Sequence, residues 1–430
     1  MTMWHQFLSS HRIGSSRPAA EAAGGSRSEF HKDYDRIIFS SAFRRLSDKT
    51  QVVPFPESDY TRQRLTHSLE VSCVGRSLAT LVYDMVRNDV QNLVSQGDFE
   101  AIVAAACLAH DIGNPPFGHF GERAIQEWAG RILNDSRFSE LTAAEQADLL
   151  RFEGNAQSFR VLTRLQMSNR RGGMRLTAAT LGALIKYPRP SLIDGTPRYR
   201  KHGCFQDDFD LFTEVFQIAG REPDTAGQYA RHPLALLSEA ADDICYAIID
   251  LEDGCRAGLV TTSTALEILE SISAGSTGNP SMPDADRLSM GRALAINELV
   301  QQCTEVFRQH SSEILEGTFG ESLVSCSPAG SACSLAKSTA FDLVYNSDRV
   351  IELEAAGYRA IQGLLDLLLD AVMASRPNSF HKHLFKLTAL EIPEHASVYQ
   401  KLLSCTDLVS GMTDRHCIEL FRRLSGHAMR

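Results

Sequence analysis

The stretch Cys107-Leu-Ala-His110-Asp111-Ile-Gly-Asn114-Pro-Pro-Phe-Gly-His119-Phe-Gly-Glu122 decides how the rest of the chain is interpreted. An apolar run over residues 101–109 predicts a buried helix that ends at adjacent His110 and Asp111. Glycine and two prolines then stop the helix. A buried imidazole and carboxylate are costly unless they are paired or bind a metal ion. Because a second histidine and a glutamate follow, the stretch combines candidate metal ligands with candidate acid–base groups.

A His-Asp pair at a helix end also has a purely structural interpretation, as a cap or as a hydrogen-bonding pair within the core. Two other segments favour a metal site. His67 lies upstream in Arg64–Glu70, and Asp242 lies downstream in Glu239–Tyr246. The chain order of His, then His-Asp, then Asp resembles the HD phosphohydrolase superfamily.

Longer motifs narrow this resemblance to bacterial deoxyguanosine triphosphate triphosphohydrolases. It extends from about residue 30 to the C-terminus and is carried by the stretch above together with Ala42–Val52, Phe152–Gln157, Lys186–Pro188, Glu239–Asp243 and Ser410–Asp414. Strand signals are sparse, so the expected class is all-α. The resemblance implies an HD-type helical core with additional C-terminal helices.

Composition sets the bounds on function. The 430 residues are 43% hydrophobic and 22% charged, as in ordinary soluble globular proteins. A net charge of −10 creates no overall basic field of the kind that indicates a nucleic-acid binder. Ten cysteines without CxxC pairs, and no signal peptide, predict reduced thiols in the cytoplasm. The run closest to a membrane span, residues 364–373, is short and contains two aspartates, so we expect no membrane span.

Composition along the chain predicts four parts. Residues 1–29 are rich in Ser, Gly and Ala and predict a flexible N-terminal arm. Residues 30–270 hold the HD-type motifs and are the expected catalytic domain. A Gly/Ser/Pro-rich stretch at 271–288 predicts a linker. Residues 289–430 predict a helical region that packs on the core or on a neighbouring subunit.

Residues 234–253 predict a helix with an acidic stripe. Glu239, Asp242, Asp243, Tyr246, Asp250 and Asp253 fall within one arc, which is usually a solvent-facing arrangement. Spacing allows either Asp242 or Asp243 to join the other candidate ligands. The resemblance selects Asp242 and implies a metal site of His67, His110, Asp111 and Asp242. Mixed nitrogen and oxygen ligands suit Mn²⁺ or Mg²⁺, with Fe²⁺, Ni²⁺ or Co²⁺ also allowed.

The resemblance also implies the remaining site residues. His119 is the expected acid–base group, and Glu122 is expected to orient it. The substrate contacts implied are Asn155, Lys186 and Tyr187 for the phosphates, Arg44, Arg45 and Lys49 for added positive charge, and Gln51, Tyr246 and Asp250 for the deoxyribose. Taken alone, the basic segment 33–49 would by default be interpreted as an amphipathic helix with a solvated basic face. Asn114 stands where many relatives have histidine, and its amide can bind a phosphate but cannot carry a proton.

The expected activity is metal-dependent cleavage of a deoxynucleoside triphosphate, dGTP foremost, into deoxynucleoside and tripolyphosphate. The family resemblance also implies a homo-oligomer, commonly a hexamer. One alternative is a different HD phosphohydrolase that acts on nucleoside monophosphates or phosphodiesters, and the long triphosphate-side motifs argue against it. Another is a nucleotide sensor or single-stranded nucleic-acid binder, and the intact ligand residues argue against loss of catalysis.

Overall fold

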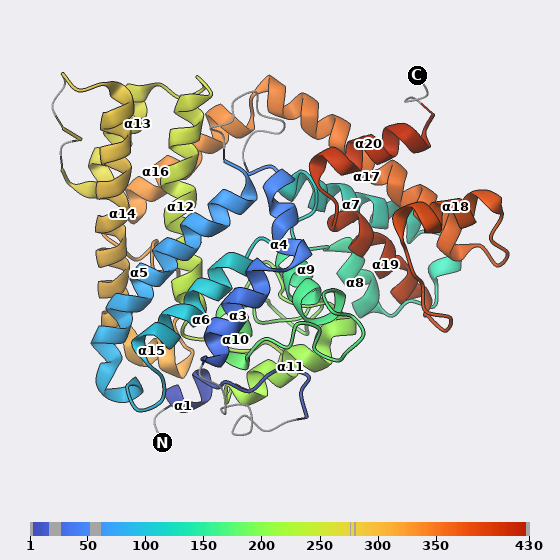
Figure 1. Cartoon of the computed structure of the whole chain (residues 1–430), viewed down its shortest axis with the longest axis horizontal. Coiled ribbons are helices and arrows are strands. Elements are labelled where there is room, and N and C mark those ends of the chain that lie inside the picture. Colours follow the sequence, from blue (N-terminus) through green and yellow to red (C-terminus); the bar gives the residue numbers. More distant parts are fainter. Residues whose placement is uncertain (1–2, 17–26, 52–61, 276, 279–280, 427–430) are drawn as a thin grey trace.

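Helices are the only regular elements in the described part of the chain. The computed structural model describes residues 3–16, 27–51, 62–275, 277–278 and 281–426. These residues contain no strand. The β-type backbone pairing among them is limited to isolated bridges, such as Arg12 with Thr177 and Thr50 with Gln63. The expected all-α class is confirmed, and Figure 1 shows the arrangement of the helices.

The helices fall into an earlier and a later set. The earlier set is α1 (Trp4–Phe7), α3 (Glu29–Ile38), α4 (Ser41–Arg45), α5 (Arg64–Val90), α6 (Gln96–Ala109), α7 (Gly118–Ile132), α8 (Ala143–Leu150), α9 (Gly154–Arg160), α10 (Ala178–Leu184), α11 (Phe209–Ile218) and α12 (Ala235–Arg256). The later set is α13 (Thr262–Ser273), α14 (Asp284–Gln309), α15 (Ser311–Glu316), α16 (Gly330–Ala340), α17 (Asp348–Met373), α18 (Ser379–Thr388), α19 (Val398–Ser410) and α20 (Asp414–Leu424). A short π-helix, η5 (Phe341–Tyr345), lies between α16 and α17.

Helix α6 is the centre of the earlier set. Its residues 101–109 are all buried, which confirms the helix expected from the apolar run. A capping box between Ser95 and Asp98 starts the helix, and His110 follows its last residue. Helices α5 and α12 pack against α6 and against each other. A helix that is apolar on all sides needs neighbours on all sides, so α6 brings the ends of α5 and α12 to its own end.

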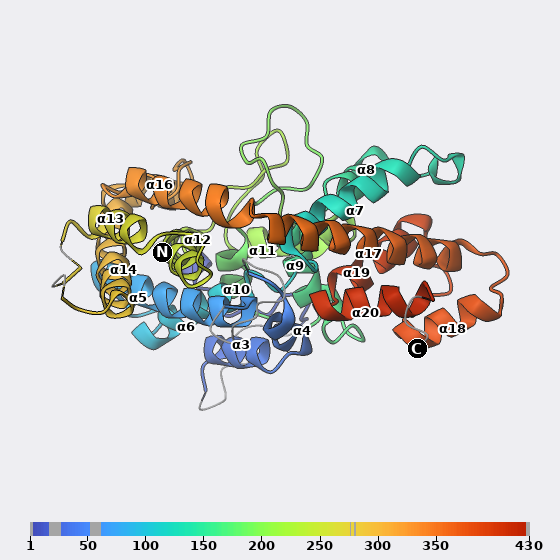
Figure 2. The same cartoon turned by 90° about the horizontal axis from the view of Figure 1, so that it is seen from above.

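The later helices pack on the earlier ones within the same chain. Helix α17 contacts α7, α19 and α20, and Figure 2 shows it running past all three. A shared apolar cluster includes Trp128 of α7 together with Leu364 and Leu368 of α17. This packing places residues after about 340 beside the start of α7, where the motif stretch lies.

Residues 3–16 correct the expectation of a flexible arm. Trp4 and Phe7 are each 2% exposed, and the Trp4 ring centroid lies 5.9 Å from that of Phe99 in α6. The average composition of this segment hid a few large apolar side chains whose burial outweighs the entropy of ordering the chain. Residues 1–2 and 17–26 of the predicted arm lie outside the described residues.

Two other sequence expectations differ in detail. The basic segment 33–49 is not one helix, because the Ser40 hydroxyl accepts the Phe43 N–H and starts a new helix, α4, after α3 has ended. In the expected linker, α13 continues to Ser273 and α14 begins at Asp284, while residues 276 and 279–280 lie outside the described part. None of the described helices is both long and apolar enough to cross a membrane.

Candidate functional site

Three helices bring the four predicted metal ligands together. His67 lies in the first turn of α5, His110 and Asp111 follow α6, and Asp242 lies on α12. Asp242 Oδ1 is 3.2 Å from His67 Nε2 and 3.4 Å from His110 Nε2. His110 Nε2 is also 3.5 Å from Asp111 Oδ1. The cluster therefore joins segments that are up to 175 residues apart in the chain.

Asp243, which spacing alone left as an alternative, points elsewhere. Its carboxylate pairs with Lys337 Nζ of α16 at 2.8 Å. The two aspartates are neighbours on α12, so a rotation of about 100° per residue directs one toward the histidines and the other toward α16.

The residues present fit a divalent cation. His110 Nδ1 donates to the Cys107 carbonyl at 2.7 Å, which leaves Nε2 directed at the two carboxylates. This buried Nε2 has no hydrogen-bond partner among the described residues. Ligand atoms of His67, His110 and Asp111 lie within 4.8 Å of one another. Two imidazoles with carboxylates form a donor set of the kind that binds Mn²⁺, Fe²⁺ or related ions.

The electrostatics of this cluster favour a positive charge at its centre. Burial by itself would lower the pKa of His110, but the Asp111 and Asp242 carboxylates outweigh it and raise the pKa to about 9. Burial would raise the pKa of Asp111, and Arg64 and His110 instead lower it to about 2. The two carboxylates thus stay ionised and attract a cation to the imidazole side.

Arg64 is a site residue that sequence reasoning missed. It begins α5, is 8% exposed, and its Nη1 donates to Asp111 Oδ2 at 2.5 Å. The Asn114 amide donates to the other oxygen of Asp111. Both oxygens of this candidate ligand are therefore oriented by neighbours. The spacing of three residues between Arg64 and His67, which puts them on one helix face, was the available signal.

A cavity of about 720 Å³ opens beside the cluster. Its wall includes the four candidate ligands and seven other predicted residues, namely Gln51, Asn114, His119, Asn155, Lys186, Tyr187 and Tyr246. A third group of wall residues comes from η5, the residue after it and α17, namely Phe341, Tyr345, Asn346 and Glu354. Sequence reasoning missed this last group, because nothing local marks residues that reach the cavity only through tertiary packing.

His119 and Glu122 form a pair at the cavity wall. His119 Nδ1 is 2.9 Å from Glu122 Oε2, and the His119 side chain is 74% exposed while that of Glu122 is 6% exposed. Glu122 Oε1 accepts the Gly154 N–H at 2.7 Å. Burial would raise the pKa of Glu122, but the hydrogen bond to His119 and its charge lower it. An anchored carboxylate thus fixes one imidazole nitrogen and leaves Nε2 for the cavity.

Cationic side chains in the wall come from four segments. They are Arg64, Arg123, Lys186 and Lys201. Lys186 Nζ lies 3.5 Å from Glu239 Oε1; burial would lower its pKa, and Glu239 with Tyr187 raises it, so the ammonium persists. Lys201 donates to Glu153 at 3.0 Å. These four cationic side chains give an otherwise acidic protein a local site at which a polyanion can bind.

Four predicted substrate residues do not line the cavity. The Arg44 side chain is exposed and donates to the Phe39 carbonyl at 3.4 Å, and Arg45 is half-buried. Lys49 is 2% exposed, and its amine donates to the carbonyls of Asn114 and Ser410. Burial lowers the pKa of Lys49 to about 7. Asp250 is fully buried and accepts the Tyr345 hydroxyl at 2.8 Å. Direct substrate contact by these four stays a prediction.

Two protein families match the chain. Residues 64–180 match the HD domain and residues 326–423 match the phosphohydrolase-associated domain. The first match covers His67, His110, Asp111 and the His119–Glu122 pair, and the second covers the wall residues of η5 and α17.

Full-length relatives agree with these matches. A deoxyguanosinetriphosphate triphosphohydrolase-like protein of Synechocystis is 41% identical over 98% of this chain and 99% of its own length. One of Pseudomonas aeruginosa is 37% identical over 99% of each chain. The deoxyguanosinetriphosphate triphosphohydrolase of Serratia proteamaculans is 31% identical over 92% of this chain and 93% of its own. The chain therefore belongs to the HD-domain family of deoxyguanosinetriphosphate triphosphohydrolase-like proteins.

Proposed function

We propose that this protein hydrolyses deoxynucleoside triphosphates, dGTP foremost, to deoxynucleoside and tripolyphosphate with the help of a divalent cation. The observation that carries the proposal is the meeting of the ligand cluster, the His119–Glu122 pair and four cationic side chains on one cavity. The names of the relatives support guanine as the base.

The cation would be held by His67, His110, Asp111 and Asp242. When bound, it supplies a polarised phosphate and a water of lowered pKa. Arg64 and Asn114 orient the Asp111 carboxylate, because each donates to one of its oxygens. The buried hydrogen bond from His110 Nδ1 to the Cys107 carbonyl fixes the orientation of the ring, so that Nε2 is the nitrogen available as a ligand.

His119 would act as the acid–base group that transfers the proton of the reaction. Water adds to the α-phosphorus, the bond to the sugar O5′ breaks, and O5′ must take up a proton as the deoxynucleoside leaves. Glu122 holds His119 through Nδ1, so Nε2 is the atom that can give this proton or take one from water. The phosphate tail would lie against Lys186, Asn155 and Tyr187, where a persistent ammonium offsets its charge.

Sugar selection would fall to the aromatic side of the cavity. The Tyr246 ring lines the cavity and stacks on Tyr345, with ring centroids 6.3 Å apart and planes 18° apart. A ring supported in this way leaves little room for a 2′-hydroxyl and offers it no hydrogen bond. Gln51 lies in the same wall and can reach the sugar from a second segment.

The decisive experiment incubates the protein with each of the four dNTPs and with GTP, in Mn²⁺ or Mg²⁺, and separates the products by anion exchange. Deoxynucleoside and tripolyphosphate in equal amounts support the proposal. Pyrophosphate with dNMP would refute the bond assignment. Cleavage confined to nucleoside monophosphates or phosphodiesters would favour a different HD phosphohydrolase.

A further inference from the structure

The motif Ser410–Asp414 forms the turn between α19 and α20, far along the chain from the candidate ligands. Asp414 is 2% exposed, and both of its carboxylate oxygens accept hydrogen bonds. Oδ2 accepts the Thr50 N–H at 2.9 Å and the Thr50 hydroxyl, and Oδ1 accepts the Phe117 N–H at 3.1 Å. Thr413, not Asp414, caps α20 through the His416 N–H. The Asp414 carboxylate therefore binds Thr50 and Phe117, which both lie outside its own helix.

Phe117 is an unusual residue for such a contact. Its φ of 60° and ψ of 22° lie in the left-handed region, which L-residues other than glycine rarely adopt. It directly precedes α7, whose first turn has no side-chain cap. His119 follows two residues later. The hydrogen bond from the Phe117 N–H to Asp414 thus helps to set the point at which α7, and with it His119, enters the cavity wall.

A second element of the associated region holds the Phe117 side chain. The ring is 6% exposed and lies against Gly357 of α17. A Cβ added at Gly357 would meet the ring atoms Cδ2, Cε2 and Cγ at 2.5, 2.7 and 2.7 Å, which is closer than real contacts. Backbone and ring of one residue are therefore held by two separate helical segments, both within residues 326–423.

We propose that the phosphohydrolase-associated region is a working part of the active site, in which Asp414 and Gly357 clasp Phe117 and so position His119. The effect on kcat that this inference predicts rests on the proposed function. Asp414 is a positioning residue, since it reaches the chemistry only through Phe117 and α7. Lys49 reinforces the same joint, because its buried amine donates to Ser410 of the turn, at 2.8 Å, and to Asn114 of the motif loop.

The substitution Asp414→Asn isolates the clasp. Three donors share the two carboxylate oxygens, and an amide offers only one acceptor oxygen, so at least one donor would face an NH₂ group. Gly357→Ala disturbs the same residue from the other side by pressing on its ring. Asp366→Asn is the matched control. Asp366 of α17 accepts from Trp128 Nε1, at 3.0 Å, and from Arg131, both further along α7 from His119.

The first measurement is amide hydrogen exchange of the full-length protein, followed by mass spectrometry. We expect the peptide covering residues 114–122 to exchange about tenfold faster in Asp414→Asn and Gly357→Ala, and at the wild-type rate in Asp366→Asn. Because exchange needs no substrate, it reports on the clasp whatever the enzyme cleaves. Wild-type exchange of this peptide in Asp414→Asn would overturn the inference.

The second measurement is a double-mutant cycle of Asp414→Asn with His119→Ala. If Asp414 acts through His119, Asp414→Asn lowers kcat about tenfold to a hundredfold in the wild-type background, with KM and metal content retained, and has little effect once His119 is removed. Equal losses in both backgrounds would reduce Asp414 to a stabilising residue and overturn the positioning role. A wild-type protein without tripolyphosphate release would refute the proposed function instead, while the exchange experiment still decides the clasp.

Discussion

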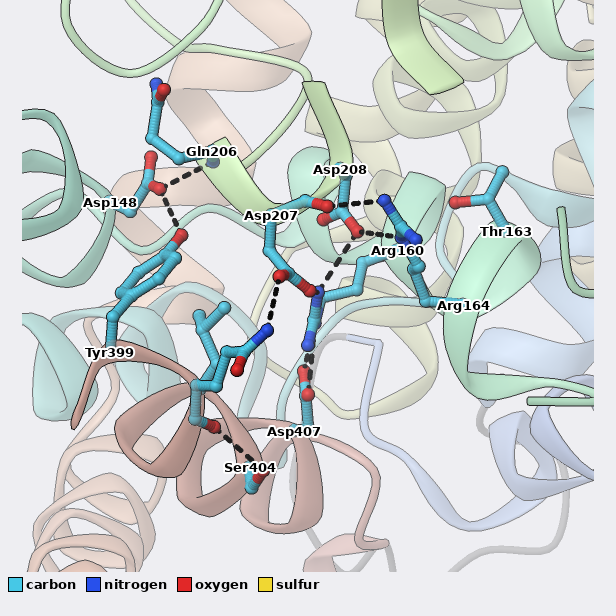
Figure 3. Close-up of polar contacts among 12 residues, drawn as sticks. Asp148, Arg160, Thr163, Arg164, Gln206, Asp207, Asp208, Tyr399, Ser404 and Asp407 are labelled. Carbon is cyan, nitrogen blue, oxygen red and sulfur yellow. Dashed lines mark hydrogen bonds and ion pairs between the residues drawn. The ribbon is translucent and has the colours of Figure 1, made fainter. Parts of the chain in front are cut away.

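Two of the buried charged clusters in the described part of this protein neutralise their carboxylates in different ways. In the ligand cluster, Asp111 and Asp242 face His67 and His110 beside a cavity. The other, the Arg160 cluster, consists of Arg160, Arg164, Asp207, Asp208 and Asp407. Figure 3 shows Arg160 of α9 joining the turn before α11 to α19. Arg160 Nη1 lies 2.9 Å from Asp207 and 3.0 Å from Asp208, and its Nε lies 2.9 Å from Asp407.

This difference in how the carboxylates are neutralised distinguishes a candidate binding site from a cluster that holds helices together. Guanidinium groups are permanent charges, and each carboxylate of the Arg160 cluster has a guanidinium partner inside the fold. Imidazoles are conditional charges, and the buried Nε2 of His110 has no hydrogen-bond partner among the described residues. None of the Arg160 cluster's five residues lines the cavity. Of these two clusters, only the one whose counter-charges are imidazoles faces the cavity.

The sharpest test of this contrast removes a ligand. His110→Ala should lose bound metal together with activity, because the cation contributes several kcal/mol to transition-state stabilisation, equivalent to a rate loss of at least about a thousandfold. Metal content by plasma mass spectrometry and initial rates measure this. His202→Ala is the control, since His202 is also buried but bonds the Cys204 and Arg151 carbonyls away from the cavity. Full metal content in His110→Ala would contradict the ligand assignment.

A second substitution tests whether His119 is an acid–base group and not a metal ligand. His119→Ala should keep its metal and its fold but lose about 10²–10⁴-fold in kcat, the usual contribution of a positioned acid–base group. Glu122→Gln keeps the size of the orienting side chain but removes its charge, and should lose less. Single-turnover rates at saturating substrate measure both. Near-wild-type rates in His119→Ala would remove this residue from the mechanism.

The Arg160 cluster should respond in the opposite manner. Arg160→Met removes the cation that pairs with Asp207, Asp208 and Asp407 and leaves, among the ion pairs of these three carboxylates in the described residues, only that of Asp208 with Arg164, which should lower the free energy of unfolding by about 3–5 kcal/mol. The kcat of the folded fraction and its metal content should stay at wild-type values. Urea unfolding combined with activity at low denaturant tests this prediction. A selective loss of kcat in a stable variant would mean that the two clusters are coupled.

The aromatic wall of the cavity gives a smaller effect, on selectivity. Tyr246→Ala should narrow the preference for dGTP over GTP, since a buried, unpaired hydroxyl costs about 1–3 kcal/mol. The ratio of kcat/KM for the two nucleotides measures this. Phe216→Leu, which alters a buried ring stacked on Tyr229 and not in the cavity wall, should leave the ratio unchanged. An unchanged ratio in folded Tyr246→Ala would exclude the ring as a steric gate.

The smallest expected effect is a pH dependence of stability from the Arg160 cluster. Three aspartates face two arginines there, and burial raises the pKa of Asp208 from 3.8 to about 7. The folded state thus binds a proton that the unfolded state releases, and this contribution to stability is lost as the pH rises toward about 7. Between about pH 5 and pH 7 the free energy of unfolding should fall by about 1 kcal/mol per pH unit, and Asp208→Asn should flatten the slope. Equal slopes in both proteins would show that Asp208 stays ionised.

Sequence patterns predicted the structure best where residues close in the chain decide it. The apolar run before His110 predicted α6 because a helix without a polar face must be buried. The pairing of His119 with Glu122 followed from a spacing of three on one helix. By contrast, composition misjudged residues 3–16, where Trp4 and Phe7 outweigh many small polar residues.

What the sequence by itself determined is which side chains are available as candidate ligands and acid–base groups, and which helices carry them. Tertiary packing decided which groups face the cavity. Asp242 rather than Asp243 joins the histidines because Lys337, distant in the chain, pairs with Asp243. Lys49 donates to main-chain carbonyls because the α19–α20 turn covers it. Tyr345 reaches the cavity because η5 packs on α16 and its hydroxyl donates to Asp250 of α12. Periodicity assigns a residue to a face of its own helix, whereas the partner of that face is set by chain segments that meet only in the folded protein.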